Sequence, residues 1–212
     1  MKEAKSRRSW RRRAQARPDE ILDAALDEFI ARGFDAARMD DVAARAGITK
    51  GALYLYFEGK EAMLRALIAR EVQPIMARME AIAASEAGDP ATLIKMAAKV
   101  VSGALANPRL FALPLLVISI SGRFPDLARF YRESVFARGR GVLASLIERG
   151  VALGQFRRVD PIAAARALMG PIMVEIVWTH ALKGPSELAE NEKLVEAQMD
   201  ILLHGISAAG AP

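Results

Sequence analysis

The sequence predicts an all-α protein with a small N-terminal three-helix domain and a larger C-terminal helical domain. Three observations lead to this prediction. Apolar residues recur at helical spacing along most of the chain. At five places a proline directly follows Asp, Asn, Phe or Gly, where it suits the first position of a helix. No stretch keeps the alternation of apolar and polar residues that is typical of a strand.

The composition is that of a globular body with a basic N-terminal arm. Of the 212 residues, 52% are hydrophobic, which is ample for a buried core. The net charge is +5, but residues 1–17 alone carry +7, so the rest of the chain sums to −2. A basic arm on a near-neutral body indicates a polyanionic partner, with DNA as the first candidate. We expect residues 1–16 to be flexible, either as a DNA-contacting arm or as a solvated tail.

Several classes of protein are excluded by what the sequence lacks. There is no cysteine, so disulfides and thiolate metal sites are excluded. The basic N-terminus is not followed by an apolar run and is therefore not a signal peptide. The strongest apolar run, 110–120, is too short to span a membrane and contains Pro114. We expect a cytoplasmic protein with no membrane partner, no metal and no cofactor.

Residues 38–57 are arranged as two short helices around a turn. The first helix has apolar residues at positions i, i+3, i+4 and i+7, namely Met39, Val42, Ala43 and Ala46. Gly47 follows them, where a left-handed backbone costs glycine little. Thr49 can cap a second helix that runs to Phe57. Two helices joined in this way form a helix-turn-helix, and the second has the right size for the DNA major groove.

The remaining helices follow from caps and breakers. The first is expected from Pro18 to about Arg32, where Gly33 ends it. A long helix from Lys60 to about Ala84 contains Pro74, which acts either as a hinge or as a static kink. The others are expected at 90–106, 108–121, 125–153, 161–183 and 187–207.

A contiguous pattern lies between Arg17 and Ala66. It consists of Ile21-Leu22-x-Ala24-Ala25, Phe29, Gly33-Phe34, Val42-Ala43, Ala46-Gly47, Leu53-Tyr54, Phe57 and Lys60-Glu61. This pattern closely resembles the DNA-binding domain of TetR-family transcriptional regulators, of the TetR/AcrR type. The resemblance implies an arm at 1–16, a DNA-binding domain at 17–64 with its helix-turn-helix at 38–57, and an effector-binding and dimerisation domain at 65–212.

The resemblance also implies which residues face DNA. These are Arg38, Thr49, Lys50, Gly51, Tyr54, Tyr56 and Lys60. Gly51 would let the backbone approach closely, and the tyrosine hydroxyls can donate to phosphate oxygens. The alternative is that both tyrosines pack inside the domain. Two residues apart on a helix they point about 200° from each other, so at least one points outward.

The chain departs from the family pattern just before the second helix. Many members carry threonine or serine where Ala37 and Arg38 stand. The helix therefore lacks its usual hydroxyl cap, and Arg38 can supply a charged contact instead. Ala52 similarly occupies a position that is often threonine, which removes a phosphate contact. By the same pattern, Lys60 is expected to hold a phosphate, while Leu53 and Phe57 point inward.

The last two helices are candidates for a dimer interface. The helix at 161–183 is apolar nearly all round and must be buried on more than one side. The helix at 187–207 has a narrower apolar seam near coiled-coil spacing. The resemblance implies a homodimer built on a four-helix interface, which would place two reading helices on a palindromic double-stranded operator. The alternative is a monomer in which these faces pack on their own domain.

A pocket for a small-molecule effector is expected among the helices at 90–183. Its candidate lining residues are Met96, Val100, Phe111, Leu113, Val117, Phe130, Met169 and Met173. The alternative for each of them is ordinary core. Glu175 stands in the same apolar stretch, where an unpaired carboxylate is costly. It is expected to pair across the dimer, to bind a polar group of the ligand, or to face water, and few other polar residues suggest a hydrophobic or amphiphilic effector.

The sequence argues against an enzyme. His180 and His204 lie on different helices, and no nucleophile with a general base can be assembled around them. The stretch Gly139-x-Gly141-x-x-Ala144 mimics a dinucleotide fingerprint, but no strand precedes it. The resemblance implies a ligand-responsive transcriptional regulator, most often a repressor. The alternatives are a regulator or architectural DNA-binding protein of the same fold without an effector, and a helical interaction module.

Overall fold

The computed structural model describes residues 2–105, 107–185 and 192–207, and within them every regular element is a helix, joined by turns and loops, with one isolated bridge between Phe156 and Ser207. The all-α prediction is confirmed. The elements in order are α1 (Lys2–Ala36), α2 (Met39–Arg45), α3 (Lys50–Tyr54), α4 (Lys60–Ala83), α5 (Pro90–Leu105), α6 (Pro108–Ile120), α7 (Pro125–Tyr131), the π-helix η1 (Arg132–Ala137), α8 (Arg138–Ala152), α9 (Pro161–Ile176), the π-helix η2 (Val177–Ala181) and α10 (Glu192–Ile206).

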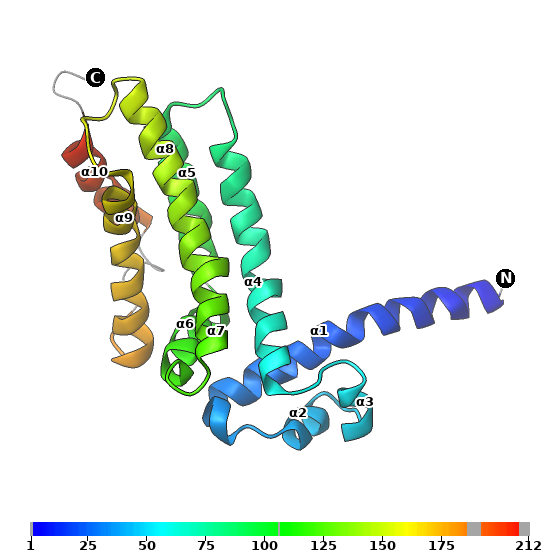
Figure 1. Ribbon diagram of the computed structural model, residues 1–212. Coiled ribbons are helices and arrows are strands. Elements are labelled where there is room, and N and C mark those ends of the chain that lie inside the picture. The colour runs from blue at the N-terminus through cyan, green and yellow to red at the C-terminus, as the bar shows by residue number, and fades with distance from the viewer. Residues whose placement is uncertain (1, 106, 186–191, 208–212) are drawn as a thin grey trace.

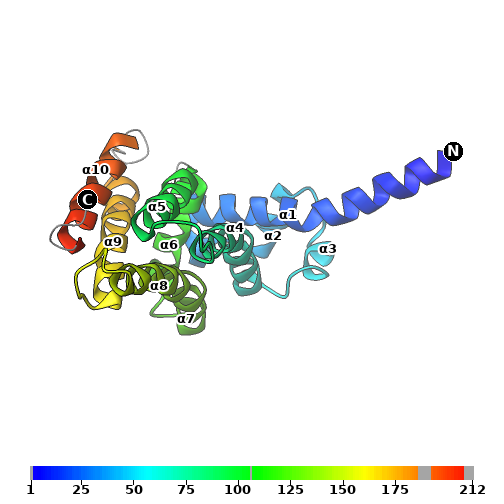
Figure 2. The ribbon, with the colours of Figure 1, turned by 90° about the horizontal axis from the view of Figure 1, so that it is seen from above.

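The helices form two parts joined by α4. Helices α1 to α3 make the small domain at the bottom of Figure 1, and α4 rises from it into a bundle with α5, α8, α9 and α10. Helices α6 and α7 lie where the two parts meet (Figures 1 and 2). This is the two-part arrangement that the sequence predicts.

The N-terminal segment differs from the sequence-based expectation. Helix α1 begins at Lys2, so residues 2–16 continue the helix instead of forming a flexible arm, and Pro18 lies inside it. The helical extension projects away from the small domain (Figures 1 and 2). Arginine, lysine, alanine and glutamine all have high helix propensity, which the argument from charge density neglected. The predicted break at Gly33 is confirmed, since its φ of 77° departs from the helix.

Helices α5, α6, α7 and α9 begin at prolines, as the sequence predicts, and the residues before two of these prolines cap their helices. The Asp160 side chain accepts from the backbone N–H of Ala163 at 2.7 Å, and the Asn107 side chain accepts from Arg109 at 3.0 Å. The single helix expected at 125–153 is instead α7, η1 and α8 in succession. A π-helical turn carries an extra residue per turn and often marks a functional site. The expected start of the last helix at residue 187 lies outside the described residues.

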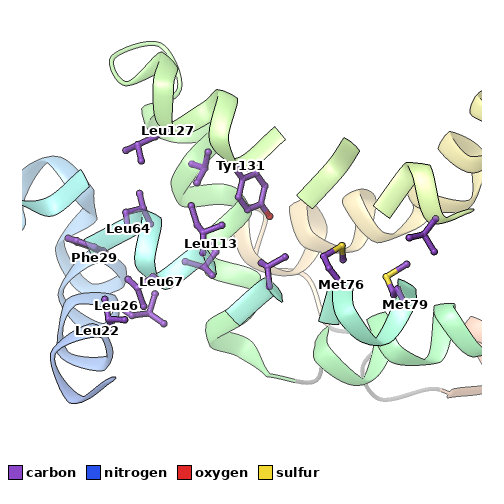
Figure 3. Close-up of a cluster of buried hydrophobic side chains, with 14 of the residues drawn as sticks. Leu22, Leu26, Phe29, Leu64, Leu67, Met76, Met79, Leu113, Leu127 and Tyr131 are labelled. Atoms are coloured by element: carbon purple, nitrogen blue, oxygen red, sulfur yellow. The ribbon is translucent and has the colours of Figure 1, made fainter. Parts of the chain in front are cut away.

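One apolar core runs from the small domain into the bundle, with α4 as its spine. Phe29 and Leu26 of α1 pack beside Leu64 and Leu67 of α4 (Figure 3). The same cluster continues through α6 and α7 to the methionines of α4, Met76 and Met79 (Figure 3). Because one helix contributes to both parts, a shift of α4 changes how the small domain is held.

One helical stretch of the described residues, Pro161–Thr179, is long and apolar enough to cross a membrane by length and composition alone. The bent pair α5 and α6 meets the same test only if it is counted as one broken span. Only 22% of the stretch Pro161–Thr179 is buried within the chain. Most of this apolar stretch is therefore exposed in the single chain.

Gly150 should tolerate no side chain, which gives a prediction for the stability of the bundle. A Cβ at Gly150 would overlap the ring of Phe156, which is buried. We expect Gly150→Ala to lower the free energy of unfolding by roughly 1–3 kcal/mol through overpacking. Gly141 lies in the same helix with open space around it, so Gly141→Ala should raise stability by about 0.5–1 kcal/mol. Urea unfolding of both variants measures this, and equal effects would contradict the prediction.

Candidate DNA-binding face and effector cavity

Helix α3 is held by the turn before it and by one buried anchor. Gly47 adopts a left-handed φ of 66°, and the N–H of Ile48 donates to the carbonyl of Ala43 at 3.0 Å. The Thr49 hydroxyl then accepts from the N–H of Ala52 at 3.2 Å, as the sequence predicts. Leu53 is fully buried, so the opposite face of α3 is turned outward.

An ionic cluster fixes α2 against α1. Glu28 of α1 is buried, and its carboxylate lies 2.8 Å from the guanidinium of Arg45 on α2. Arg32 approaches the other oxygen of the same carboxylate at 3.0 Å and also pairs with Asp41 of α2 at 3.1 Å. Since α3 follows α2 after a short turn, this cluster helps to set the angle at which α3 is presented.

The exposed surface beside α3 carries polar and apolar groups. The helix ends at Tyr54, three residues before the predicted end at Phe57, so Tyr56 lies in the turn that follows. Tyr54 and Tyr56 are 47% and 39% exposed, and both hydroxyls can therefore reach a partner. Gly51 has open space where a Cβ would stand. Arg38 is exposed and makes no capping hydrogen bond to α2, so the helix lacks a side-chain cap, as the sequence predicts.

Lys50 is engaged within the chain. Its ammonium lies 2.9 Å from the carboxylate of Asp40 on α2, and both side chains are more than half exposed. The hydrogen bond to this carboxylate and its negative charge raise the pKa of Lys50. The pair lies at the surface, where a phosphate can compete with the carboxylate for the lysine.

Lys60 makes hydrogen bonds within the small domain. Its ammonium donates to the carbonyls of Phe34 and Asp35 at 2.7 and 3.0 Å and lies 5.0 Å from the centroid of the Phe34 ring. These carbonyls follow the break at Gly33, so the lysine connects the short segment after that break to the start of α4. The structure therefore gives Lys60 a bridging role between α1 and α4, whereas the sequence suggested a phosphate clamp.

The hydrogen bonds of Lys60 should contribute to the stability of the small domain. We expect Lys60→Met to lower the free energy of unfolding by about 1.5–3 kcal/mol, because charge-assisted hydrogen bonds to two backbone carbonyls are lost. Lys50→Met removes an exposed ion pair and should leave the urea midpoint unchanged. If Lys60→Met unfolds at the wild-type midpoint, the hydrogen bonds to the end of α1 do not stabilise the domain.

Sequence reasoning missed one residue of this face. Leu55 is 85% exposed between the two tyrosines. The signal was available, because Leu53 and Phe57 fill the inward positions and leave the residue between them outside. An exposed leucine at this place can contact the methyl group of thymine or a sugar.

A cavity of about 140 Å³ lies in the bundle between α4, α5, α6, η1, α8 and α9. Its walls are apolar except for the hydroxyl of Tyr131 at the end of α7. The lining residues are Val72, Ile75, Met76, Met79, Val101, Ala104, Leu110, Pro114, Tyr131, Val135, Phe136, Gly139, Leu143, Met169, Ile172, Met173 and Ile176.

Of the nine sequence-based pocket candidates, the structure brings Met169 and Met173 to this cavity. The other seven lie elsewhere: Met96, Val100, Phe111, Leu113, Val117, Phe130 and Glu175. Three of these are ordinary core, namely Phe111, Leu113 and Val117. Met96 is 47% exposed and borders a groove beside α10.

The remaining three candidates, Val100, Phe130 and Glu175, have other surroundings. Val100 is partly buried against the core, and the Phe130 ring lies 5.1 Å from the guanidinium of Arg65. Glu175 is buried and accepts from the hydroxyl of Thr179 at 3.1 Å, one helical turn further on. The α4 residues of the lining were missed, although Val72, Met76 and Met79 repeat at i, i+4 and i+7.

The cavity wall is connected to α1 by polar contacts. Arg109 precedes the lining residue Leu110 on α6 and pairs with Asp27 of α1 at 2.8 Å. Arg123, after α6, pairs with Asp35 at 2.6 Å. A change in the cavity that displaces α6 therefore acts directly on the first helix of the small domain.

These features define a class: a helix-turn-helix DNA-binding protein with an attached helical domain that encloses an apolar cavity. Residues 21–67 match the family model described as bacterial regulatory proteins, tetR family, and residues 91–204 match the AefR-like transcriptional repressor C-terminal domain. The chain belongs to the TetR family of transcriptional regulators. The predictions of family and fold class are confirmed, and the family confirms that the chain is a regulator and not an enzyme.

Individual relatives show where the similarity is concentrated. The HTH-type transcriptional regulator SrpR of Pseudomonas putida is 44% identical over 55 residues, which are 26% of this chain and 26% of its own length. The HTH-type transcriptional repressor KstR2 of Rhodococcus jostii is 24% identical over 196 residues, 91% of this chain and 92% of its own. A TetR-family regulator from Mesorhizobium loti has a similar structure, with a TM-score of 0.74 at 25% identity, covering 92% of this chain and 99% of that one.

Proposed function

We propose that this protein is a homodimeric, sequence-specific transcriptional repressor in the cytoplasm, released from a palindromic operator by a small hydrophobic effector. The observation that carries the proposal is the exposed surface at the end of α3, where Tyr54 of the helix and Leu55 and Tyr56 of the turn after it stand out beside the buried anchor Leu53. The apolar cavity in the bundle supports the second half of the proposal, that an effector binds to this protein.

The proposed contacts with DNA come from α3, from residues near it and from the basic start of α1. Tyr54 and Tyr56 donate their hydroxyls to phosphates, and Gly51 lets the start of α3 approach the groove. Thr49, Lys50 and Arg38 are also exposed and are proposed as further contacts. The basic extension of α1 adds charge that attracts the DNA backbone irrespective of sequence.

The proposed dimer interface lies on α9, η2 and α10. These elements form one side of the bundle (Figure 2), and they expose large apolar side chains to solvent in the single chain. The residues concerned are Ile162, Val174, Val177, Trp178, Leu182 and Ile201. A second copy related by two-fold symmetry would cover this surface and would explain why the apolar stretch Pro161–Thr179 is so little buried.

The proposed response to the effector works through α6. Leu110 and Pro114 of this helix line the cavity, and Arg109 holds α1. A ligand that favours a displaced α6 changes the position of α1, and with it the distance between the two α3 helices of the dimer. For release, the ligand must bind the displaced state more tightly than the DNA-bound state.

The experiment selects DNA with the purified full chain from pooled genomic fragments at about 150 mM salt, where binding by charge alone is weakened. We expect one palindromic site to be enriched. The double variant Tyr54→Phe/Tyr56→Phe should lose affinity for that site while keeping its fold. The matched control is Tyr131→Phe, in the other domain, which should bind the site as the wild type does. Enrichment of no common site would contradict a sequence-specific regulator.

The alternative of a regulator without an effector is separated from this proposal by a second measurement. Apolar small molecules are added to the complex of protein and selected site. Release by some of them supports the repressor with an effector. Stable DNA binding in the presence of every molecule that enters the cavity would favour a regulator or architectural protein that has no effector.

A further inference from the structure

The cavity contains one polar side chain that the repressor mechanism does not use. Tyr131 is 6% exposed, and it is the last residue of α7. Among the described residues no group is hydrogen-bonded to its hydroxyl, and the oxygen is not one of the fully buried unpaired atoms, so it keeps access to the space of the cavity and can donate to a molecule bound there. In Figure 3 its oxygen lies on the side of the ring that faces Met76 of α4, another lining residue.

The surroundings of this hydroxyl restrict the chemistry of a ligand. No lining residue carries a charge, so neither an anionic nor a cationic head group would find a counter-charge inside. Burial raises the pKa of Tyr131, and the phenol therefore stays protonated and able to donate. The remaining walls offer only carbon and thioether groups, which suit an apolar body.

We propose that the effector is a neutral molecule with a hydrogen-bond-accepting oxygen on a small apolar body, and that the Tyr131 hydroxyl donates to this oxygen. A ketone, ester or amide carbonyl meets this description. The inference rests on the proposed function, because it names the class of effector and the residue that selects it. Tyr131 is here a specificity-determining residue of the cavity.

The position of Tyr131 connects ligand selection to the small domain. Helix α7 begins after Phe124, whose ring packs edge to face on Phe34 of the small domain at 5.2 Å. It ends at Tyr131, whose ring packs on Phe136 of η1 at 5.6 Å. One short helix therefore contacts the DNA-binding domain at its start and the cavity at its end, so that a ligand bound to the hydroxyl acts on both.

The size of the cavity suggests suitable probes. At about 140 Å³ it is close to the engineered apolar cavity of about 150 Å³ that holds benzene. Acetophenone, cumene and benzoate are all benzene rings with one small branched substituent. Acetophenone carries a neutral carbonyl, cumene carries no polar group, and benzoate carries a negative charge. Comparing their affinities separates the effect of the accepting oxygen from the effect of the apolar body.

The experiment measures binding of these three probes to the full chain without DNA, by calorimetry, in the wild type and in Tyr131→Phe. We expect the wild type to bind acetophenone and cumene and to reject benzoate. Tyr131→Phe should weaken acetophenone by about three- to tenfold, the effect of one lost hydrogen bond, and leave cumene unchanged. Tyr56→Phe, in the other domain, is the matched control and should bind all three as the wild type does.

The ratio of the acetophenone and cumene dissociation constants decides the question, because a collapsed cavity in the variant would weaken both probes. An unchanged ratio in Tyr131→Phe overturns the proposal, as does binding of benzoate as tight as that of acetophenone, or binding of no probe. The outcome is separate from that of the DNA selection. Failure to enrich a site removes the repressor function but leaves the measured selectivity of the cavity intact.

Discussion

Replacing Val174 by aspartate is expected to convert the proposed dimer into monomers and to lower operator affinity on the order of a thousandfold, towards non-specific binding. Val174 is 68% exposed on α9, so the substitution removes no contact from the core of the single chain. In a dimer the same position would place a carboxylate in an apolar interface without a partner, which is strongly unfavourable. Ile201→Asp on α10, where the side chain is 72% exposed, should have the same effect.

The mass in solution is measured by light scattering, operator affinity by titration, and the fold by thermal unfolding at low protein concentration. The control is Leu153→Asp, since Leu153 is 62% exposed at the end of α8 and not part of the proposed interface. It should remain dimeric with unchanged operator affinity. A dimeric Val174→Asp variant, or a monomeric wild type, would show that α9 and α10 do not form the interface.

The helix-turn-helix could be predicted from the sequence because short-range patterns encode it. The glycine turn, the threonine cap and the inward positions of Leu53 and Phe57 all lie within twenty residues of one another. Each of these requires only local spacing and the conformational preferences of single residues. The structure confirms the turn at Gly47 and the cap at Thr49 for the same physical reasons.

The cavity could not be predicted in the same way, because its walls come from helices that are distant in the sequence. Met96 and Met76 both occupy apolar positions at helical spacing, yet Met76 lines the cavity while Met96 is half exposed. Which face of a helix meets the cavity depends on how α4, α6, α8 and α9 pack. The π-helical turn η1 also rotates the positions that follow it, so a regular period through 125–153 assigns faces incorrectly.

The contacts of Lys60 in the small domain also could not be predicted from the sequence. Its place beside the motif suggested a phosphate contact, but its ammonium is directed to two carbonyls at the end of α1. Those carbonyls become available only because Gly33 breaks the helix and brings its end next to α4. A sequence pattern locates the lysine, whereas the folded chain determines which acceptors surround it.

Replacing Arg45 by methionine is expected to lower the free energy of unfolding by about 2–3 kcal/mol, somewhat less than for a fully buried pair that loses its only partner. Glu28 is buried and its carboxylate would keep Arg32 alone. The loss is reduced because Arg45 itself is 45% exposed and is hydrated in part. Urea unfolding measures the effect. Arg129→Met, which breaks an exposed pair with Asp126, is the control and should cost less than about 1 kcal/mol.

A double-mutant cycle with Glu28→Gln assigns the effect to the pair. With the charge on residue 28 removed, the loss of Arg45 leaves no uncompensated carboxylate, so the double variant should be more stable than the sum of the single effects by at least about 1 kcal/mol. Additive effects would mean that Arg45 contributes through the packing of its stem, not through its charge. Because the pair joins α1 to α2, and α2 positions α3, a coupled result would also connect the buried carboxylate to the orientation of the proposed reading helix.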